Sequence, residues 1–211
     1  MKPSPALAAA ALSLALGGCI SVFPKAPPAQ LYAFGTDFPA AQAADTGAPP
    51  FNVMRSSTSF TQAAAGDRIL TTNGQQAAYI AANRWVSPAT MLFDQAETRA
   101  FDANPGPAKL TRRGEIAGAA AELRLEVQTF EARYPGNLKS APTVVVQVRA
   151  VLVGLADRRV VGTKIFKSRL ALGDNRVSEI VRGFDAATVE VLSQIVGWTD
   201  SLASAVTLPA G

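Results

Sequence analysis

The side chains that enzymes most often use for catalysis are scarce in this sequence. It contains no histidine and a single cysteine among 211 residues. A Ser–His–Asp triad therefore cannot form, and a cysteine-rich metal site is excluded. The serines at Ser56, Ser57 and Ser59 lack the G-x-S-x-G context of an activated nucleophile. A Ser–Lys dyad is left formally open, although no S-x-x-K motif accompanies Lys164 or Lys167.

Three glutamates lie close enough in sequence to be considered as a catalytic acid–base pair. Glu122, Glu126 and Glu131 fall in a stretch where charged and apolar residues alternate. In a strand, Glu122 and Glu126 share one face with Arg124 between them, which indicates charge-balanced exposure rather than a shifted pKa in a cleft. We therefore expect a protein that is not an enzyme, needs no metal and works by binding.

The only cysteine closes a leader segment. Lys2 supplies a positive charge, and residues 6–16 are almost wholly small or apolar, as in a secretory signal. These 11 residues would rise roughly 16 Å as a helix, too short to span the hydrocarbon core. The leader ends in a sequence that resembles the bacterial lipobox, Leu16-Gly17-Gly18-Cys19. The alternative is an ordinary cleaved signal in which Cys19 is only a small hydrophobic residue.

We expect the leader 1–18 to be removed and Cys19 to carry a diacylglycerol and an N-acyl chain such as palmitate, with no other cofactor. Two or three acyl chains anchor a protein stably, whereas one binds marginally. Ile20 follows where aspartate would resemble an inner-membrane retention signal. The lipid anchor is thus expected on the periplasmic face of the outer membrane in a Gram-negative cell.

The mature chain is expected to consist of a Pro-containing tether over 19–30 and one domain over 31–208. Short strands are predicted at 31–34, 51–55 and 68–72, and residues 76–85 pair back as a hairpin after Asn73-Gly74, although a helix is left open there. The stretch 39–50 is rich in Ala, Pro and Gly and is predicted to be a loop. Ser87-Pro88 indicates the start of a helix that ends near Asn104.

The second half of the domain alternates more clearly. Residues 122–134 predict a long strand whose parity shifts near Thr129, either through a β-bulge or through a change of the buried side. Residues 144–152 and 160–172 predict an antiparallel hairpin. Apolar residues at helical spacing from Ile180 to Leu202 predict a helix that covers the sheet. The fold class expected is therefore α+β, a mainly antiparallel sheet covered by two helices in a single domain.

Cations and tryptophans are the candidates for contacts with a partner. Five cations occur without an intervening acid between Asp157 and Asp174, and they could face an acidic partner or anionic lipid: Arg158, Arg159, Lys164, Lys167 and Arg169. A solvated hairpin face is the alternative, and in a regular strand Lys164 points opposite to the other two strand cations. Trp85 could contact a partner or anchor the core, and the same holds for Trp198.

The balance of charge excludes one class of partner. With 20 Lys and Arg against 16 Asp and Glu the chain is only mildly basic. It has no dense basic block with interleaved aromatic residues, so we do not expect it to bind nucleic acid.

The whole pattern resembles the ABC-type transport auxiliary lipoprotein family, which includes the paraquat-inducible lipoprotein. The resemblance rests on degenerate positions spread over the chain: the lipobox, Leu31-Tyr32, the Y-x5-W-x-x-P pattern of Tyr79, Trp85 and Pro88, then Phe130, Tyr134, Arg159, Phe166 and the helix from Phe184 to Trp198.

The resemblance implies a non-enzymatic component of a transport system for lipids or other hydrophobic compounds. Its partners would be a protein with a mammalian-cell-entry (MCE) domain and an ABC permease and ATPase. The alternative function is that of a structural lipoprotein in an outer-membrane assembly or envelope-stabilising complex. The sequence leaves the transported compound and the oligomeric state open, a homo-oligomer included.

Overall fold

The computed structural model describes residues 28–39, 49–111 and 118–206 of the chain. The expectations for the leader, the lipobox with Cys19 and the tether up to residue 27 therefore concern residues outside the described part, as does most of the loop predicted over 39–50. Within the described residues, no helix is both long and apolar enough to cross a membrane.

The described chain forms nine strands, two α-helices and a short 3-10 turn. In chain order these are β1 (Gln30–Tyr32), β2 (Phe51–Arg55), β3 (Ser59–Phe60), β4 (Arg68–Asn73), β5 (Gln76–Trp85), α2 (Ala89–Asp102), β6 (Ala108–Leu110), β7 (Ala121–Tyr134), β8 (Thr143–Gly154), β9 (Val160–Ala171), α3 (Val177–Ser201) and η1 (Ala203–Ala205). The expected α+β class is confirmed, and residues 76–85 are a strand rather than a helix.

All nine strands belong to one mixed sheet. The long strands β7, β8 and β9 form an antiparallel ladder, and β4 and β5 form the predicted hairpin. The other edge of β7 is occupied in turn by β2, β3 and β4, each parallel to it. β6 extends the sheet beyond β2, and β1 extends it beyond β5. The parallel pairings were not expected, because the strands that make them are short and leave no clear alternation.

A β-bulge in β7 explains the shift in parity seen in the sequence. Val127 pairs with Val148 and Thr129 pairs with Gln147, so Gln128 is an extra residue on β7. Val127 and Phe130 are both buried, at 1% and 2% exposure, although they are three residues apart. The bulge therefore keeps the apolar side chains of both halves of β7 on the same face of the sheet.

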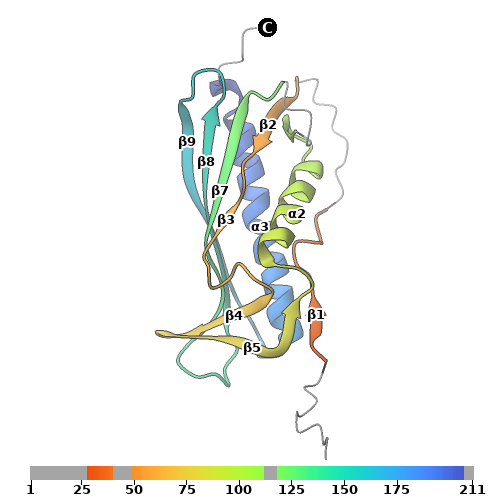
Figure 1. Ribbon diagram of the computed structural model, residues 1–211, viewed down its shortest axis with the longest axis vertical. Coiled ribbons are helices and arrows are strands. Elements are labelled where there is room, and N and C mark those ends of the chain that lie inside the picture. The colour runs from red at the N-terminus through yellow and green to blue at the C-terminus, as the bar shows by residue number, and fades with distance from the viewer. Residues whose placement is uncertain (1–27, 40–48, 112–117, 207–211) are drawn as a thin grey trace, which may run out of the picture.

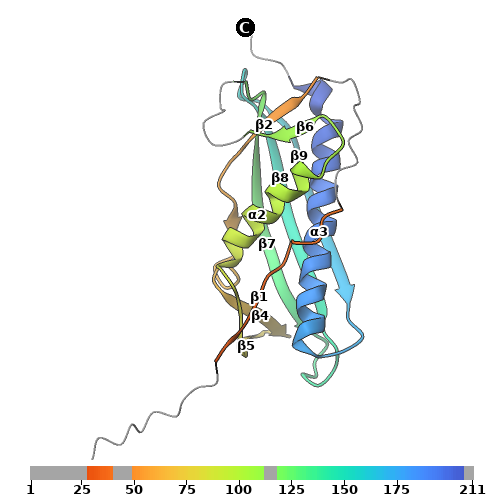
Figure 2. The ribbon, with the colours of Figure 1, turned by 90° about the vertical axis from the view of Figure 1, so that its right-hand side faces the viewer.

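Both α-helices cover one face of this sheet. Figures 1 and 2 show α3 lying lengthwise along the long strands, with α2 beside it on the same side. The β1 strand and the β4–β5 hairpin lie at one end of the domain, and the β8–β9 turn lies at the other (Figure 1). The opposite face of β7, β8 and β9 carries no helix in the described part of the chain.

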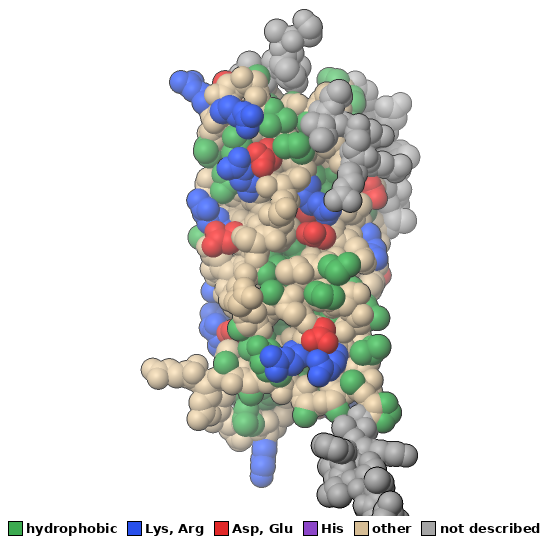
Figure 3. Space-filling model, viewed as in Figure 1, with side chains coloured by type: hydrophobic (Ala, Val, Ile, Leu, Met, Phe, Trp, Pro, Cys, Tyr) green, Lys and Arg blue, Asp and Glu red, His purple; other side chains and the backbone are tan. Residues whose placement is uncertain are grey.

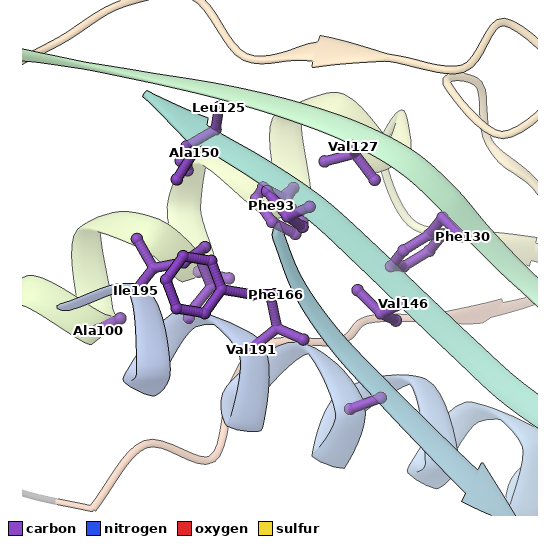
Figure 4. Close-up of a cluster of buried hydrophobic side chains, with 14 of the residues drawn as sticks. Phe93, Ala100, Leu125, Val127, Phe130, Val146, Ala150, Phe166, Val191 and Ile195 are labelled. Carbon is purple, nitrogen blue, oxygen red and sulfur yellow. The ribbon is translucent and has the colours of Figure 1, made fainter. Parts of the chain in front are cut away.

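The core lies between the helices and the inner face of the sheet. Side chains from β7 and β8 point toward α2 and α3, as Figure 4 shows for Val127 and Val146. Phe130 stands at the centre of an aromatic cluster, with ring centroids of Phe34 and Phe184 at 4.9 and 4.7 Å. These rings and the surrounding aliphatic side chains are almost wholly buried, which makes their burial the main source of stability.

A glycine brings α3 close to the sheet. Gly183 lies within α3, where the sequence alone indicates a cost of roughly 1 kcal/mol relative to alanine. A Cβ at this position would lie 2.8 Å from Leu172 and 2.9 Å from Val144. The missing side chain is therefore what allows the start of the helix to pack against β8 and the end of β9.

Candidate interaction surface

The two tryptophans belong to the packed interior rather than to a partner surface. Trp85 is 2% exposed, and its ring packs edge-on against Phe34 and Phe184 at 4.9 and 5.3 Å. Its place among the partner-binding candidates is corrected by this burial, because an enclosed indole cannot reach a second protein. Trp198 is partly buried against the core and contacts Phe166, with ring centroids 5.7 Å apart.

β9 is an edge strand. It pairs with β8 on one side only, and no other strand of the described chain pairs with it. Phe166 and Ser168 point toward α3 and are buried, at 3% and 1% exposure. Ile165, Lys167 and Arg169 lie on the opposite face and are exposed. β9 therefore presents to solvent both an outer face and a free row of backbone groups.

The cations predicted from the sequence gather on β9 and the turn before it. Lys167 and Arg169 project from the outer face, whereas Lys164 lies on the α3 face with its Nζ atom 5.1 Å from the centre of the Phe166 ring. Strand parity predicts this orientation of Lys164, opposite to that of Lys167 and Arg169. Figure 3 shows Lys and Arg side chains following the side of the molecule where β9 lies.

The β8–β9 turn adds two further cations. Arg158 adopts a left-handed backbone conformation with φ of 59°, and the N–H of Arg159 donates to Oδ1 of Asp157 at 3.0 Å. The turn is closed by a hydrogen bond from the N–H of Gly154 to the carbonyl of Arg159, at 2.9 Å. We call Arg158, Arg159, Lys164, Lys167 and Arg169 together the basic edge.

The basic edge differs from the neighbouring strands β7 and β8 in its charge pairing. On β7, Glu122 lies 2.7 Å from Arg124 and Glu131 lies 2.6 Å from Arg133. Glu126 of β7 lies 3.6 Å from Arg149 of β8. By contrast, no member of the basic edge forms an ion pair with a carboxylate among the described residues. The positive charge without a paired carboxylate therefore lies along β9 and the β8–β9 turn.

The three glutamates considered for catalysis do not form an acid–base pair. The guanidinium of Arg124 donates to Glu122 and holds the pKa of that carboxyl below its usual range, and Arg158 acts in the same direction. An open groove of about 380 Å³ lies beside them, lined by Ser56, Ser57, Ser59, Arg124, Leu125, Glu126, Arg149 and Val151. Its one acid, Glu126, is half exposed and paired with Arg149, as predicted for a charge-balanced strand face. Glu122 is also paired, but it is largely buried and not exposed as the sequence predicted.

One titratable group in the interior was missed by the sequence analysis. Glu97 of α2 is fully buried, and burial raises its pKa to about 8 even though Arg55 opposes the shift. The Nη1 atom of Arg55 lies 3.7 Å from Oε2 of Glu97, and neither carboxyl oxygen has a hydrogen-bond partner. The spacing in the sequence indicates this burial, because Phe93, Glu97 and Phe101 recur every four residues and so share one helix face with two apolar members.

No cluster of three or more metal-ligating carboxylate or cysteine side chains occurs within the described ranges. The feature that the described residues do bring together is an outward-facing basic strand. What it can do chemically is attract and hold an anionic partner.

The fold is similar to that of several solved structures. Protein XCC0632 from Xanthomonas campestris, assigned to DUF330, shares 21% identity at a TM-score of 0.70, with 83% of this chain and 98% of that chain covered. An uncharacterised protein shares 13% identity at a TM-score of 0.64, with 82% of this chain and 99% of that chain covered. The hypothetical protein CT253 from Chlamydia trachomatis shares 9% identity at a TM-score of 0.52, with 75% of this chain and 99% of that chain covered. At these identities the likeness concerns the fold alone.

None of the curated proteins matches the chain. A family model does match it, however, over residues 37–196, and that family is described as the ABC-type transport auxiliary lipoprotein component. The match begins ahead of β2 and ends within α3, so it takes in the whole sheet except β1. The chain therefore belongs to the ABC-type transport auxiliary lipoprotein family.

Proposed function

We propose that this protein is a non-enzymatic auxiliary component of an ABC transport system for lipids or other hydrophobic compounds, anchored in the outer membrane through Cys19. The domain would stand in the periplasm and bind an MCE-domain protein of the same system through the basic edge. The observation that carries this proposal is the uncompensated positive charge on a free strand of a domain that the family model assigns to transport auxiliaries.

The anchor and the basic edge act together in this proposal. Acyl chains on Cys19 would keep the domain at one membrane, and the residues between Cys19 and β1 would limit how far it moves. Confinement of this kind raises the local concentration of the binding surface, so that a contact of modest affinity stays occupied. The transported compound need not touch the protein, whose contribution is to hold the transport components together.

Replacing Cys19 with alanine should release the protein from the membrane. The thioether-linked diacylglycerol cannot form without the sulfur, and the acyl chains are what make attachment stable. We expect the variant to move from the membrane fraction to the soluble periplasmic fraction and transport to fall, while the domain keeps its circular dichroism spectrum. Unchanged membrane fractionation of the variant, or mass spectrometry that finds no acyl chain on Cys19 of the native protein, would contradict the anchor.

Reversing the charge on the basic edge should weaken capture of the partner. The double variant Lys167→Glu with Arg169→Glu places two acids where an acidic partner would bind, and we expect roughly tenfold lower affinity at low salt, with less effect at high salt. Crosslinking and co-purification from native membranes measures this. Lys139→Glu is the control, because Lys139 is exposed in the β7–β8 turn at the other end of the domain.

The proteins recovered in that experiment also separate the two functions considered from the sequence. Recovery of an MCE-domain protein supports the transport auxiliary. Recovery of barrel-assembly proteins alone would instead favour a structural lipoprotein of an outer-membrane complex. An effect of Lys139→Glu equal to that of the double variant would show that the overall charge, and not the basic edge, governs capture.

A further inference from the structure

The backbone of β9 leaves an alternate set of hydrogen-bonding groups without partners. The N–H of Leu172 donates to the carbonyl of Pro142 at 3.0 Å, and the register continues without a break from Thr143 opposite Ala171 to Leu152 opposite Gly162. Hydrogen-bonded and non-hydrogen-bonded pairs alternate in an antiparallel ladder. The outward N–H and C=O groups are therefore those of Thr163, Ile165, Lys167, Arg169 and Ala171.

Apart from its cationic side chains, this edge lacks the features by which proteins block strand addition. It is long, it contains no proline, and its only register shift lies at its start, opposite Leu152 and Val153. No strand of the described residues covers it. Ile165 is 54% exposed and gives the outer face an apolar contact point. An extended chain could therefore pair with β9 over about nine residues.

The charges on β9 discriminate between possible occupants of this edge. Lys164, Lys167 and Arg169 occur in the strand with no acid among them. A second copy of β9 would bring cations beside cations in a parallel in-register pairing and in an antiparallel pairing centred on Lys167, which is the arrangement that natural edge strands use against self-association. An extended segment with acidic side chains at alternate positions would place carboxylates beside Lys167 and Arg169 instead.

We infer that β9 accepts an extended, acidic segment of another protein as an additional strand of the sheet. Main-chain hydrogen bonds to the outward groups would supply affinity, and alternate side chains would supply specificity through Lys167, Arg169 and Ile165. The inference rests on the proposed function in that the segment belongs to a transport partner. It adds the mode of recognition, because the basic edge would then act through its backbone as well as its charge.

The test uses the full chain in detergent and a synthetic ten-residue peptide in which glutamate alternates with valine. In Lys167→Pro the outward N–H is lost while the ladder bonds to β8 stay, since residue 167 does not donate to β8. We expect at least tenfold weaker peptide binding, against about threefold for Lys167→Ala, which loses only the charge. Thr163→Pro repeats the backbone change without altering any charge, and circular dichroism checks that each variant is folded.

Hydrogen exchange provides a readout that charge alone would not move. When the peptide binds, the amides of Thr163, Ile165, Lys167 and Arg169 should gain protection, whereas those of Phe166 and Ser168 are already bonded to β8. Equal binding by the proline and alanine variants, protection absent from the outward amides, or a dimer paired through β9 would each overturn the inference. Because the peptide assay contains no transport component, its failure is distinct from failure of the proposed function.

Discussion

Replacing Gly35 with alanine should destabilise the domain by about 3 kcal/mol. Gly35 has φ of +66°, a conformation that costs a residue with a side chain roughly 1 kcal/mol. The added Cβ would also lie 2.3 Å from the Cβ of Ala96 in α2, and relief of such an overlap in a packed core costs typically 1–3 kcal/mol. Urea unfolding followed by circular dichroism measures the loss.

A second glycine separates the two contributions. Gly74, in the β4–β5 turn, has φ of +60°, but beyond its own chain neighbours no atom lies within 4 Å of the position of its Cβ. Gly74→Ala should therefore lose only the conformational part, about 1 kcal/mol. Ala96→Gly should recover part of the loss in the Gly35→Ala background, because it removes the atom that the new Cβ overlaps. Equal losses at Gly35 and Gly74 would show that close packing on α2 contributes nothing.

The position of Gly35 matters because it joins the start of the domain to its core. The guanidinium of Arg99 in α2 donates to the carbonyl of Gly35 at 3.1 Å. Phe34, the residue before it, is fully buried and packs on Phe130. The sequence predicts a strand up to Phe34, whereas β1 ends at Tyr32. The two residues after β1 leave the sheet so that Phe34 can enter the core and the backbone of Gly35 can contact α2.

The long strands could be predicted from the sequence because each has one buried and one exposed face. Alternation in 122–134 and 144–152 gave both β7 and β8, and the break in alternation near Thr129 indicated the bulge. β3 and β6 could not be predicted, since strands of two and three residues are too short for a period to appear. Their pairings depend on where the chain passes β7 and β2, which is decided by tertiary packing.

The basic edge could be predicted only in part. The run of cations from Arg158 to Arg169 is visible in the sequence, and parity correctly separates Lys164 from Lys167. That β9 lies at an edge of the sheet is not visible, because it depends on the following segment forming α3 and covering the face instead of pairing with β9. The core role of Trp85 likewise became definite only when Phe34 and Phe184, distant in sequence, were placed beside it.

Replacing Glu97 with glutamine should remove most of the decline in stability that we expect for the native protein as pH rises toward 8. The pKa of Glu97 is raised from 4.5 to about 8 by burial, so the folded state binds this proton more tightly than the unfolded state does. The stability that this proton contributes is fully present below pH 4.5. It is lost as pH rises through the pKa of Glu97 in the folded state, and the free energy of unfolding falls by up to about 1.4 kcal/mol per pH unit.

The groups around Glu97 explain why its charged form is unfavourable. Arg55 is the nearby cation, but its Nη1 atom donates to the backbone carbonyl of Asp94 at 2.8 Å and lies 3.7 Å from the Glu97 carboxyl. The carboxyl of Asp94 raises the pKa further, and its Oδ1 atom is itself buried without a hydrogen-bond partner. Ionisation of Glu97 would therefore place a second negative charge where only one loosely held guanidinium can offset it.

Urea unfolding of native and Glu97→Gln chains at pH 5, 6, 7 and 8 tests this account. Glutamine matches glutamic acid in shape and cannot ionise, so the variant should show a flatter pH profile and exceed the native stability at pH 8. In Arg55→Gln the carboxyl loses the cation that lowers its pKa, and carbon NMR of the Glu97 carboxyl should then show a midpoint above about 8. Two outcomes would contradict this account: parallel pH profiles for the native and Glu97→Gln chains, or a native Glu97 carboxyl that titrates near 4.5. Either would mean that the core beside α2 admits enough water to solvate the charge.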